Sequence, residues 1–224
     1  MSALANDLLN VARGMTAARL SVGTAGNVSV RDNTDAADGF WVTPSGMVPE
    51  RCEAADMTRV RADGSAHGRR APSSEWRLHR DIYAARPDVG AILHAHAPFA
   101  TALACHRLDV PAFHYMVARF GGDSVRCGSY ATFGTQALSD ATVKALENRS
   151  AALMANHGMI VLAPDLATLL DRAIELEMLC EHYWRARCLG EPPCLDDAQM
   201  REALVQFRWY GRPRPLDADP DAPQ

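Results

Sequence analysis

The sequence predicts an α/β fold, namely a single-domain α/β/α sandwich with a central mixed, largely antiparallel sheet. Short apolar runs typical of strands alternate with longer amphipathic stretches typical of helices, so we expect one sheet with helices on both faces. Several connections are short enough to join antiparallel neighbours. The 224 residues fit one large domain with a substantial core, and no internal repeat is present.

We assign residues 1–211 to this domain and residues 212–224 to a tail. The tail is rich in proline and aspartate, a composition typical of disorder. Within the domain, helices are expected at 2–20, 75–86, from 98 onward, 135–147, 166–189 and 197–210. Strands are expected at 28–30, 40–42, 56–64, 91–96 and, as a bent pair, 151–163.

Each expected helix carries apolar residues at the spacing of an amphipathic helix, and local signals mark several ends. Ser73 and Ser74 can cap free backbone N–H groups at the start of the helix over 75–86, and Pro87 stops it. Pro98 suits the first turn of the next helix. Gly190 lies just past the longest helix.

The expected strands are short apolar runs bounded by small and polar residues. The run over 91–96 is apolar except for two histidines. Since strand side chains alternate between faces, Ile92, His94 and His96 share one face. Residues 151–163 read as two strands that bend at His157-Gly158.

Composition excludes several classes of function. The net charge is −4, so the chain lacks the excess of positive charge that is typical of nucleic-acid-binding proteins. No apolar run approaches the ~20 residues of a membrane span, and the N-terminus lacks a signal peptide, so a cytoplasmic protein is expected. The six cysteines include no C-x-x-C pair and are expected to be free thiols, most of them buried.

Three histidines are the candidate metal ligands. A strand face that carries His94 and His96 must give both rings a polar partner, and His157 follows another apolar run. Three imidazoles leave a fourth position open, which is typical of catalytic zinc sites. Glu75 could fill that position at rest or act as a base, and His79 lies one turn further along the same helix face and could orient it.

Two alternatives stay open for these histidines. The three rings could simply be buried and hydrogen-bonded, because histidine often packs without binding a metal. If a metal is bound, Zn²⁺ fits best, but Mn²⁺, Fe²⁺ or Co²⁺ could replace it.

Three small polar segments are candidates for an anion site. Glycine lets backbone N–H groups approach an oxyanion closely, and a helix N-terminus favours negative charge. Each segment alone could be a plain turn or cap. Together they predict a phosphate site formed by Gly26, Asn27, Ser45, Gly46, Ser73 and Ser74.

Five motifs in order resemble the class II aldolase/adducin family. They are Thr24-Ala25-Gly26-Asn27-Val28-Ser29, Thr43-Pro44-Ser45-Gly46, Ser73-Ser74-Glu75, His94-Ala95-His96 and Asn156-His157-Gly158. The resemblance covers about residues 5–211 and makes residues 1–211 a class II aldolase-like zinc-binding domain. Further motifs are similar to the branch that cleaves L-fuculose 1-phosphate, namely His114-Tyr115-Met116, Tyr130-Ala131-Thr132-Phe133-Gly134-Thr135 and Tyr210-Gly211.

The resemblance implies a homotetramer with active sites between subunits and one Zn²⁺ per subunit, held by His94, His96 and His157. It implies that Glu75 is a metal ligand at rest and the base in catalysis, and it places the phosphate of the substrate in the anion site. It also implies that Tyr115 is an acid reaching a neighbouring subunit's site, with Phe133 and Tyr210 shaping the aldehyde end.

The activity implied is reversible cleavage of a ketose 1-phosphate, such as L-fuculose 1-phosphate, into dihydroxyacetone phosphate and an aldehyde such as lactaldehyde. No Schiff-base lysine is needed, and the sole lysine is Lys144 in an expected surface helix. Alternatives within the family are a 5-deoxyketose-phosphate aldolase, a pentulose-phosphate 4-epimerase, a methylthioribulose-phosphate dehydratase and a sugar-acid phosphate decarboxylase. A non-catalytic adducin-like module is a further alternative, although it would not need an open metal site.

Overall fold

The computed structural model describes residues 3–32 and 39–209, so the predictions for the tail and for Tyr210 lie outside the described residues. The strands of the described residues form one sheet in the order β4-β3-β2-β1-β5-β8-β7-β6. Neighbouring strands are antiparallel except β6 and β7, which are parallel. The prediction of a mixed, largely antiparallel sheet is confirmed.

The bounds agree with the sequence expectation within a few residues for most elements. The strands are β1 (Asn27–Asp32), β2 (Gly39–Val42), β3 (Thr58–Arg61), β4 (Ala66–His67), β5 (Ala91–Ala95), β6 (Arg126–Gly128), β7 (Ala151–Met154) and β8 (Gly158–Ala163). The α-helices are α1 (Ala3–Ala17), α2 (Trp76–Ala85), α3 (Pro98–Cys105), α4 (Gln136–Ala145), α5 (Leu166–Arg187) and α6 (Asp197–Trp209). Short 3₁₀ helices are η1 (Pro49–Arg51), η2 (Ala54–Asp56) and η3 (Tyr115–Phe120).

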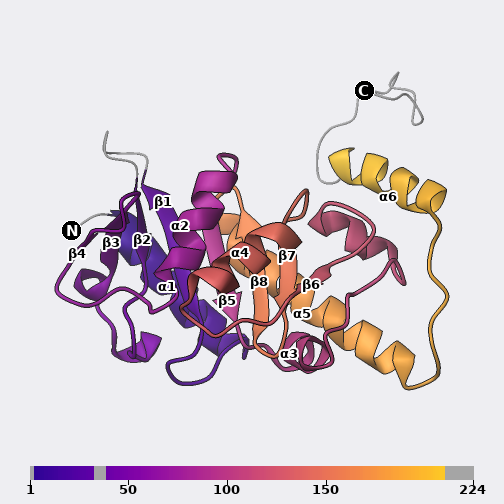
Figure 1. The fold of residues 1–224 in the computed structure, drawn as a ribbon, viewed down its shortest axis with the longest axis horizontal. Coiled ribbons are helices and arrows are strands. Elements are labelled where there is room, and N and C mark those ends of the chain that lie inside the picture. The colour runs from indigo at the N-terminus through magenta and orange to yellow at the C-terminus, as the bar shows by residue number, and fades with distance from the viewer. Residues whose placement is uncertain (1–2, 33–38, 210–224) are drawn as a thin grey trace.

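Helices cover both faces of the sheet, as expected for an α/β/α sandwich (Figure 1). On one face, Leu93 of β5 packs in a core with α1, α3 and α5. On the other face, Ile92 packs in a second core with α2 and α4. Both side chains are fully buried, and burial of each contributes about 1.5–3 kcal/mol to stability. The alternation of β5 side chains therefore divides the two cores and places His94 on the α2 face.

Two features of the fold differ from the sequence expectation. The strands β4 and β6 were not predicted, because two or three residues are too few to show a two-residue period. The helix α2 is not capped by a serine side chain: Glu75 is its N-cap residue, and the Ser73 hydroxyl accepts the backbone N–H of Glu75 instead, at 3.3 Å. The Ser73 side chain therefore bonds within the turn before α2 and does not cap its first turn.

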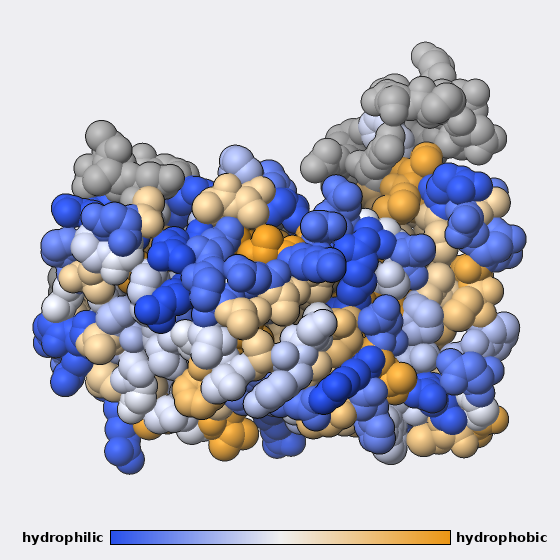
Figure 2. All heavy atoms as spheres, in the orientation of Figure 1, coloured by the Kyte–Doolittle hydropathy of each residue, from blue (hydrophilic) through white to orange (hydrophobic). Residues whose placement is uncertain are grey.

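The C-terminal helix α6 lies beyond the main body of the sandwich and packs on η3 (Figure 1). In Figure 2 the visible face is largely hydrophilic, and apolar residues appear along α6 at the upper right. Lys144 is exposed on α4, as predicted. Among the described residues, no helix is both long and apolar enough to cross a membrane.

Candidate functional site

The three candidate histidines come from two places that the sheet brings together. His94 lies near the end of β5, and His96 follows directly after it. His157 lies in the tight turn between β7 and β8, and antiparallel pairing of β5 with β8 sets Ala95 opposite Met159. Gly158 is required there, because a Cβ atom on it would collide with the Ala95 carbonyl oxygen and press on the His96 ring.

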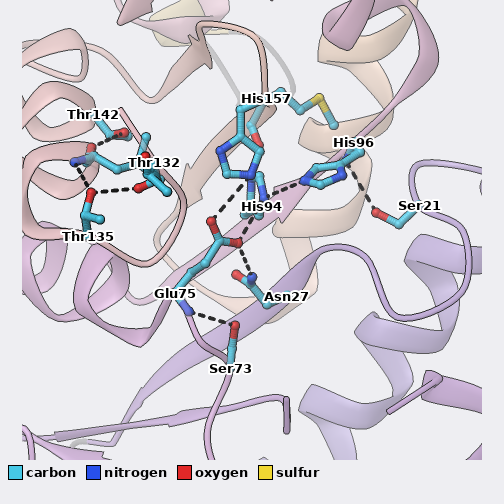
Figure 3. Close-up of polar contacts among 12 residues, drawn as sticks. Ser21, Asn27, Ser73, Glu75, His94, His96, Thr132, Thr135, Thr142 and His157 are labelled. Atoms are coloured by element: carbon cyan, nitrogen blue, oxygen red, sulfur yellow. Dashed lines mark hydrogen bonds and ion pairs between the residues drawn. The ribbon is translucent and has the colours of Figure 1, made fainter. Parts of the chain in front are cut away.

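The imidazole rings and the Glu75 carboxylate converge on one point (Figure 3). The ligand atoms of the three histidines all lie within 4.8 Å of one another, and His94 Nε2 is 3.1 Å from His96 Nε2. Glu75 Oε2 is 3.2 Å from His94 Nε2, and Glu75 Oε1 is 3.4 Å from His157 Nε2. The structure therefore brings together the four side chains that the sequence singled out.

The protonation states suit metal ligands. His94 Nδ1 donates a hydrogen bond to the Met159 carbonyl oxygen at 2.9 Å, which leaves a lone pair on Nε2 directed at the centre of the group. Burial lowers the pKa of His94 to about 3 and, together with the neighbouring His94, that of His157 to about 4. Burial also lowers the pKa of His96. At neutral pH all three rings are uncharged nitrogen donors.

The alternative of simply packed histidines fits this geometry poorly. A hydrogen bond between His94 and His96 satisfies one pair of nitrogens, yet Glu75 Oε1 is buried without any hydrogen-bond partner. Such an orphaned carboxylate oxygen is costly, and a divalent cation at the centre would satisfy it together with the imidazole lone pairs. Three nitrogens and one carboxylate oxygen form a typical donor set for zinc. The residues present therefore fit a divalent metal.

The three small polar segments meet at one cavity of about 320 Å³ beside the histidines. Its lining includes all the residues predicted for the anion site, namely Gly26, Asn27, Ser45, Gly46, Ser73 and Ser74. Backbone hydrogen bonds hold two of the segments together, from Ser45 N to Ala71 O and from Ser73 N to Thr43 O, each at 3.0 Å. Glu75, His96 and His157 line the same cavity, so the anion site and the candidate metal site are adjacent.

Glycine is needed in the first of these segments. Gly26 has φ +78°, and a Cβ atom there would lie 2.9 Å from the His94 carbonyl oxygen. The described residues that line the cavity include no lysine or arginine. An anion there would therefore be bound by backbone N–H groups and by the hydroxyls of Ser45 and Ser74, both of which are exposed.

The side chain of Asn27 lies between Glu75 and His79. Its Nδ2 donates to Glu75 Oε2 at 3.0 Å, and its Oδ1 bonds with His79 Nε2 at 2.5 Å. The carboxamide is thus engaged by two buried side chains, and the place of Asn27 at the anion site stays a prediction. His79, which the sequence suggests could orient Glu75, is linked to it through Asn27.

Phe133 and Tyr115, whose roles are implied only by the resemblance, lie farther from the three histidines than Glu75 does. Phe133 lines the rim of the cavity with Tyr130, and both rings are more than half exposed. Tyr115 lines a separate hollow of about 870 Å³ between η3 and α6, where it stacks on Phe207 with ring centroids 6.0 Å apart. Within one chain, therefore, Tyr115 lies in another hollow than Glu75.

Sequence reasoning missed other residues of the cavity wall. Tyr130 and Ala131 line the cavity and belong to the motif over 130–135, from which the resemblance implies a role only for Phe133. Asn156 adopts φ +53°, and its backbone N–H bonds to the Ala104 carbonyl oxygen at 2.9 Å, which fixes the turn that carries His157. The Asn-His-Gly sequence of that turn was the available signal, because asparagine tolerates left-handed conformations.

The fold and this site together define a class of proteins, the class II aldolase type. The profile described as "Class II Aldolase and Adducin N-terminal domain" matches residues 6–184. The chain belongs to the class II aldolase and adducin family. Class II aldolases are metal-dependent lyases, and the three-histidine group is the place where a metal could bind here.

Named relatives cover nearly the whole chain. The chain is 46% identical over 218 residues to a 5-methylthioribulose-1-phosphate/5-deoxyribulose-1-phosphate aldolase of Rhodospirillum rubrum, with 97% of each chain covered. It is 38% identical over 209 residues to the L-fuculose phosphate aldolase of Escherichia coli strain K12, with 93% of this chain and 95% of the relative covered. A solved L-fuculose 1-phosphate aldolase superposes with a TM-score of 0.88 at 36% identity, covering 93% and 97% of the two chains.

Proposed function

We propose that the protein is a metal-dependent aldolase that cleaves a ketose 1-phosphate into dihydroxyacetone phosphate and an aldehyde. One observation carries the proposal: Glu75, His96 and His157 of the converging group line a cavity whose other segments contribute glycines and the exposed residues Ser45 and Ser74. A substrate with its phosphate on those segments extends its carbonyl carbon toward the histidines. Binding of the remote phosphate would hold the reacting carbons in place.

The histidines would hold one divalent metal per subunit, most suitably Zn²⁺. His94, His96 and His157 supply neutral nitrogens, and Glu75 completes the set at rest. When bound, the metal supplies Lewis-acid stabilisation of the negative charge that develops on the three-carbon fragment. The exposed Lys144 on α4 plays no part, so the reaction does not pass through a Schiff base.

Two side chains would move protons. In cleavage, the C4 hydroxyl loses its proton, the C3–C4 bond breaks, and its electron pair stays on C3 of the dihydroxyacetone phosphate half. Glu75, after taking up a proton from solvent, protonates C3, and it removes the same proton in the condensation direction. We propose Tyr115 of a neighbouring subunit in a homotetramer as the group that exchanges the C4 hydroxyl proton, because Tyr115 is 52% exposed and lines a separate hollow of its own chain.

The aldehyde end of the substrate faces a mostly apolar rim. Tyr130, Ala131 and Phe133 lie on the same cavity as the anion segments and offer two aromatic rings and a methyl group. L-fuculose 1-phosphate, 5-deoxyribulose 1-phosphate and 5-methylthioribulose 1-phosphate all end in a methyl or methylthio group that suits such a rim. The higher identity to the Rhodospirillum rubrum relative favours the two pentulose phosphates over L-fuculose 1-phosphate.

A panel of these three ketose phosphates tests the proposal. The metal-loaded protein is expected to release dihydroxyacetone phosphate in a 1:1 ratio with the aldehyde, with a higher kcat/KM for the pentulose phosphates. A chelator should abolish the release, and added Zn²⁺ should restore it. Lys144→Ala is the matched control and is expected to keep the wild-type kcat/KM. Absence of dihydroxyacetone phosphate from all three substrates would contradict the aldolase assignment.

A cytoplasmic enzyme is the setting we propose for this reaction. The six cysteines are free thiols, as a reducing compartment would leave them.

Only Cys52 and Cys180 are buried, and Cys105, Cys188 and Cys194 are exposed, so the expectation that most of the cysteines are buried is wrong.

A further inference from the structure

A row of buried polar side chains runs from Glu75 away from the cavity, between β1 and α2. Asn27 Nδ2 lies 3.0 Å from Glu75 Oε2, and Asn27 Oδ1 lies 2.5 Å from His79 Nε2. Ser29 Oγ lies 2.7 Å from His79 Nδ1 and 2.9 Å from the Tyr83 hydroxyl. His79 and Ser29 have no exposed surface, so water does not compete for these hydrogen bonds.

The row arises from two periodicities that match. Asn27 and Ser29 are two residues apart on β1 and so point to one face of the sheet. His79 and Tyr83 are four residues apart on α2 and lie on one face of the helix, with Glu75 one turn before them. The rise of about 6 Å over four helical residues is close to the roughly 7 Å between alternate strand residues, so the partners meet in register.

The direction of every hydrogen bond in the row follows from the carboxylate at its end. An ionised carboxylate only accepts, so the amide NH₂ of Asn27 must face Glu75 and its oxygen must face His79. His79 Nε2 therefore carries the proton, and Nδ1 accepts from the Ser29 hydroxyl. Ser29 in turn accepts from the Tyr83 hydroxyl. One arrangement of protons satisfies the whole row.

We propose that His79 is a positioning residue, which Ser29 and Tyr83 hold as the Nε2–H tautomer so that the Asn27 carboxamide presents its NH₂ to Glu75 Oε2. The proposal deepens the proposed function and rests on it, because it concerns the placement of Glu75 beside the metal ligands. Without the His79 donor, the carboxamide is free to turn its oxygen toward the carboxylate. The hydrogen bond from Asn27 to Glu75 Oε2 is then no longer held in place, and Glu75 is free to move away from His94.

Two substitutions of equal polarity separate positioning from packing. The amide nitrogen of glutamine falls near the place of the histidine Nε2, so His79→Gln keeps the donor to Asn27. Asparagine is shorter, so His79→Asn loses that donor. We expect His79→Asn to lower kcat by about 10–100-fold with little change in KM, and His79→Gln to rescue most of it. Equal losses in the two variants, in proportion to their fall in Tm, would show a structural role only and overturn the proposal.

A spectroscopic readout needs no substrate. The visible spectrum of Co²⁺ reports its ligands, and the Co²⁺-loaded Glu75→Gln variant gives the reference spectrum for a displaced carboxylate. The Co²⁺ spectrum of His79→Asn should resemble that reference, and that of His79→Gln should resemble the wild type. A wild-type spectrum for a folded His79→Asn variant overturns the proposal. An unchanged spectrum for Glu75→Gln instead removes Glu75 as a resting ligand, a failure of the proposed function.

The tautomer can be measured in the unmodified chain, whatever the fate of the variants. In zinc-loaded protein labelled with ¹⁵N at histidine, the His79 resonances are assigned by their loss in His79→Gln, or by their coupling to the ring protons if that variant does not fold. We expect the proton on Nε2, because Nε2 faces the Asn27 amide oxygen and Nδ1 faces the Ser29 hydroxyl. Burial lowers the pKa of His79 to about 3, which keeps the ring neutral. A proton on Nδ1 would reverse every hydrogen bond in the row and refute the positioning role.

Discussion

Replacing Glu75 with glutamine is expected to lower kcat for dihydroxyacetone phosphate release by about 10²–10⁴-fold, the usual contribution of a general base. Glutamine keeps the shape of the side chain, but it cannot take a proton from carbon. Glu75 is buried beside His94 and His157, so no solvent base reaches the same position. The three histidines remain, so the metal should stay bound.

The measurement for this variant combines steady-state kinetics, elemental analysis and thermal unfolding. A loss of kcat with unchanged metal content and a Tm near that of the wild type supports the role of Glu75 as the base. Asp81→Asn, which changes a carboxylate on the same helix that bonds Ser139 and Gln136, is the matched control and should keep kcat. A fully metallated Glu75→Gln variant that turns over at the wild-type rate would show that another group moves the proton.

The His94→Ala variant is expected to lose stoichiometric zinc. His94 has no exposed surface, and its Nε2 lies within 3.2 Å of both His96 Nε2 and Glu75 Oε2, so it is the innermost of the three ligands. Two histidines and one carboxylate would hold the cation far less tightly, and the alanine leaves a gap that water fills. Elemental analysis of dialysed protein measures the loss directly.

The control for this prediction is His106→Ala, which removes an exposed histidine at the end of α3. That variant should keep one zinc per chain. Circular dichroism of both variants shows whether the fold persists, because the His94 ring also fills space in the core. If folded His94→Ala protein keeps a full equivalent of zinc, the metal has other ligands.

Local pattern was enough to predict the strand with the histidines. The alternation of β5 placed Ile92 and His94 on one face from the sequence, and the two cores confirm it. The Asn-His-Gly turn supplied the third ring, because that combination fits a tight bend after an apolar strand. The sequence pattern alone could not show whether the three imidazole rings meet, because that depends on the pairing of β5 with β8.

The contacts of Asn27 could not be predicted from local sequence. Asn27 lies opposite His94 because β1 pairs with β5 in one particular register, and no residue near either strand reveals that register. From the sequence, Asn27 belongs to the predicted anion site, and its side-chain contacts with Glu75 and His79 become visible only in the fold. The sequence also assigned a cap to Ser73 and Ser74, whereas the tertiary contacts of Glu75 determine how α2 begins.

The prediction of the anion site, in contrast, rests on several motifs that are weak signals individually but point to the same kind of site. Ser45-Gly46 and Ser73-Ser74 are each ordinary turn sequences, and neither alone predicts a site. The structure joins them through the backbone hydrogen bonds of Ser45 and Ser73. The prediction for Tyr115 came only from the family resemblance. Within a single chain Tyr115 lines a different hollow from that of Glu75. Its proposed role therefore requires a second subunit.

An anomalous-scattering map of zinc-loaded crystals, recorded at the zinc absorption edge, tests the central claim most directly. We predict one strong peak per chain, about 2.0–2.1 Å from the ring nitrogens of His94, His96 and His157, the usual zinc–nitrogen distance. A crystal with equimolar zinc and no peak among these three rings would contradict the claim, and with it the chemistry assigned to the cavity.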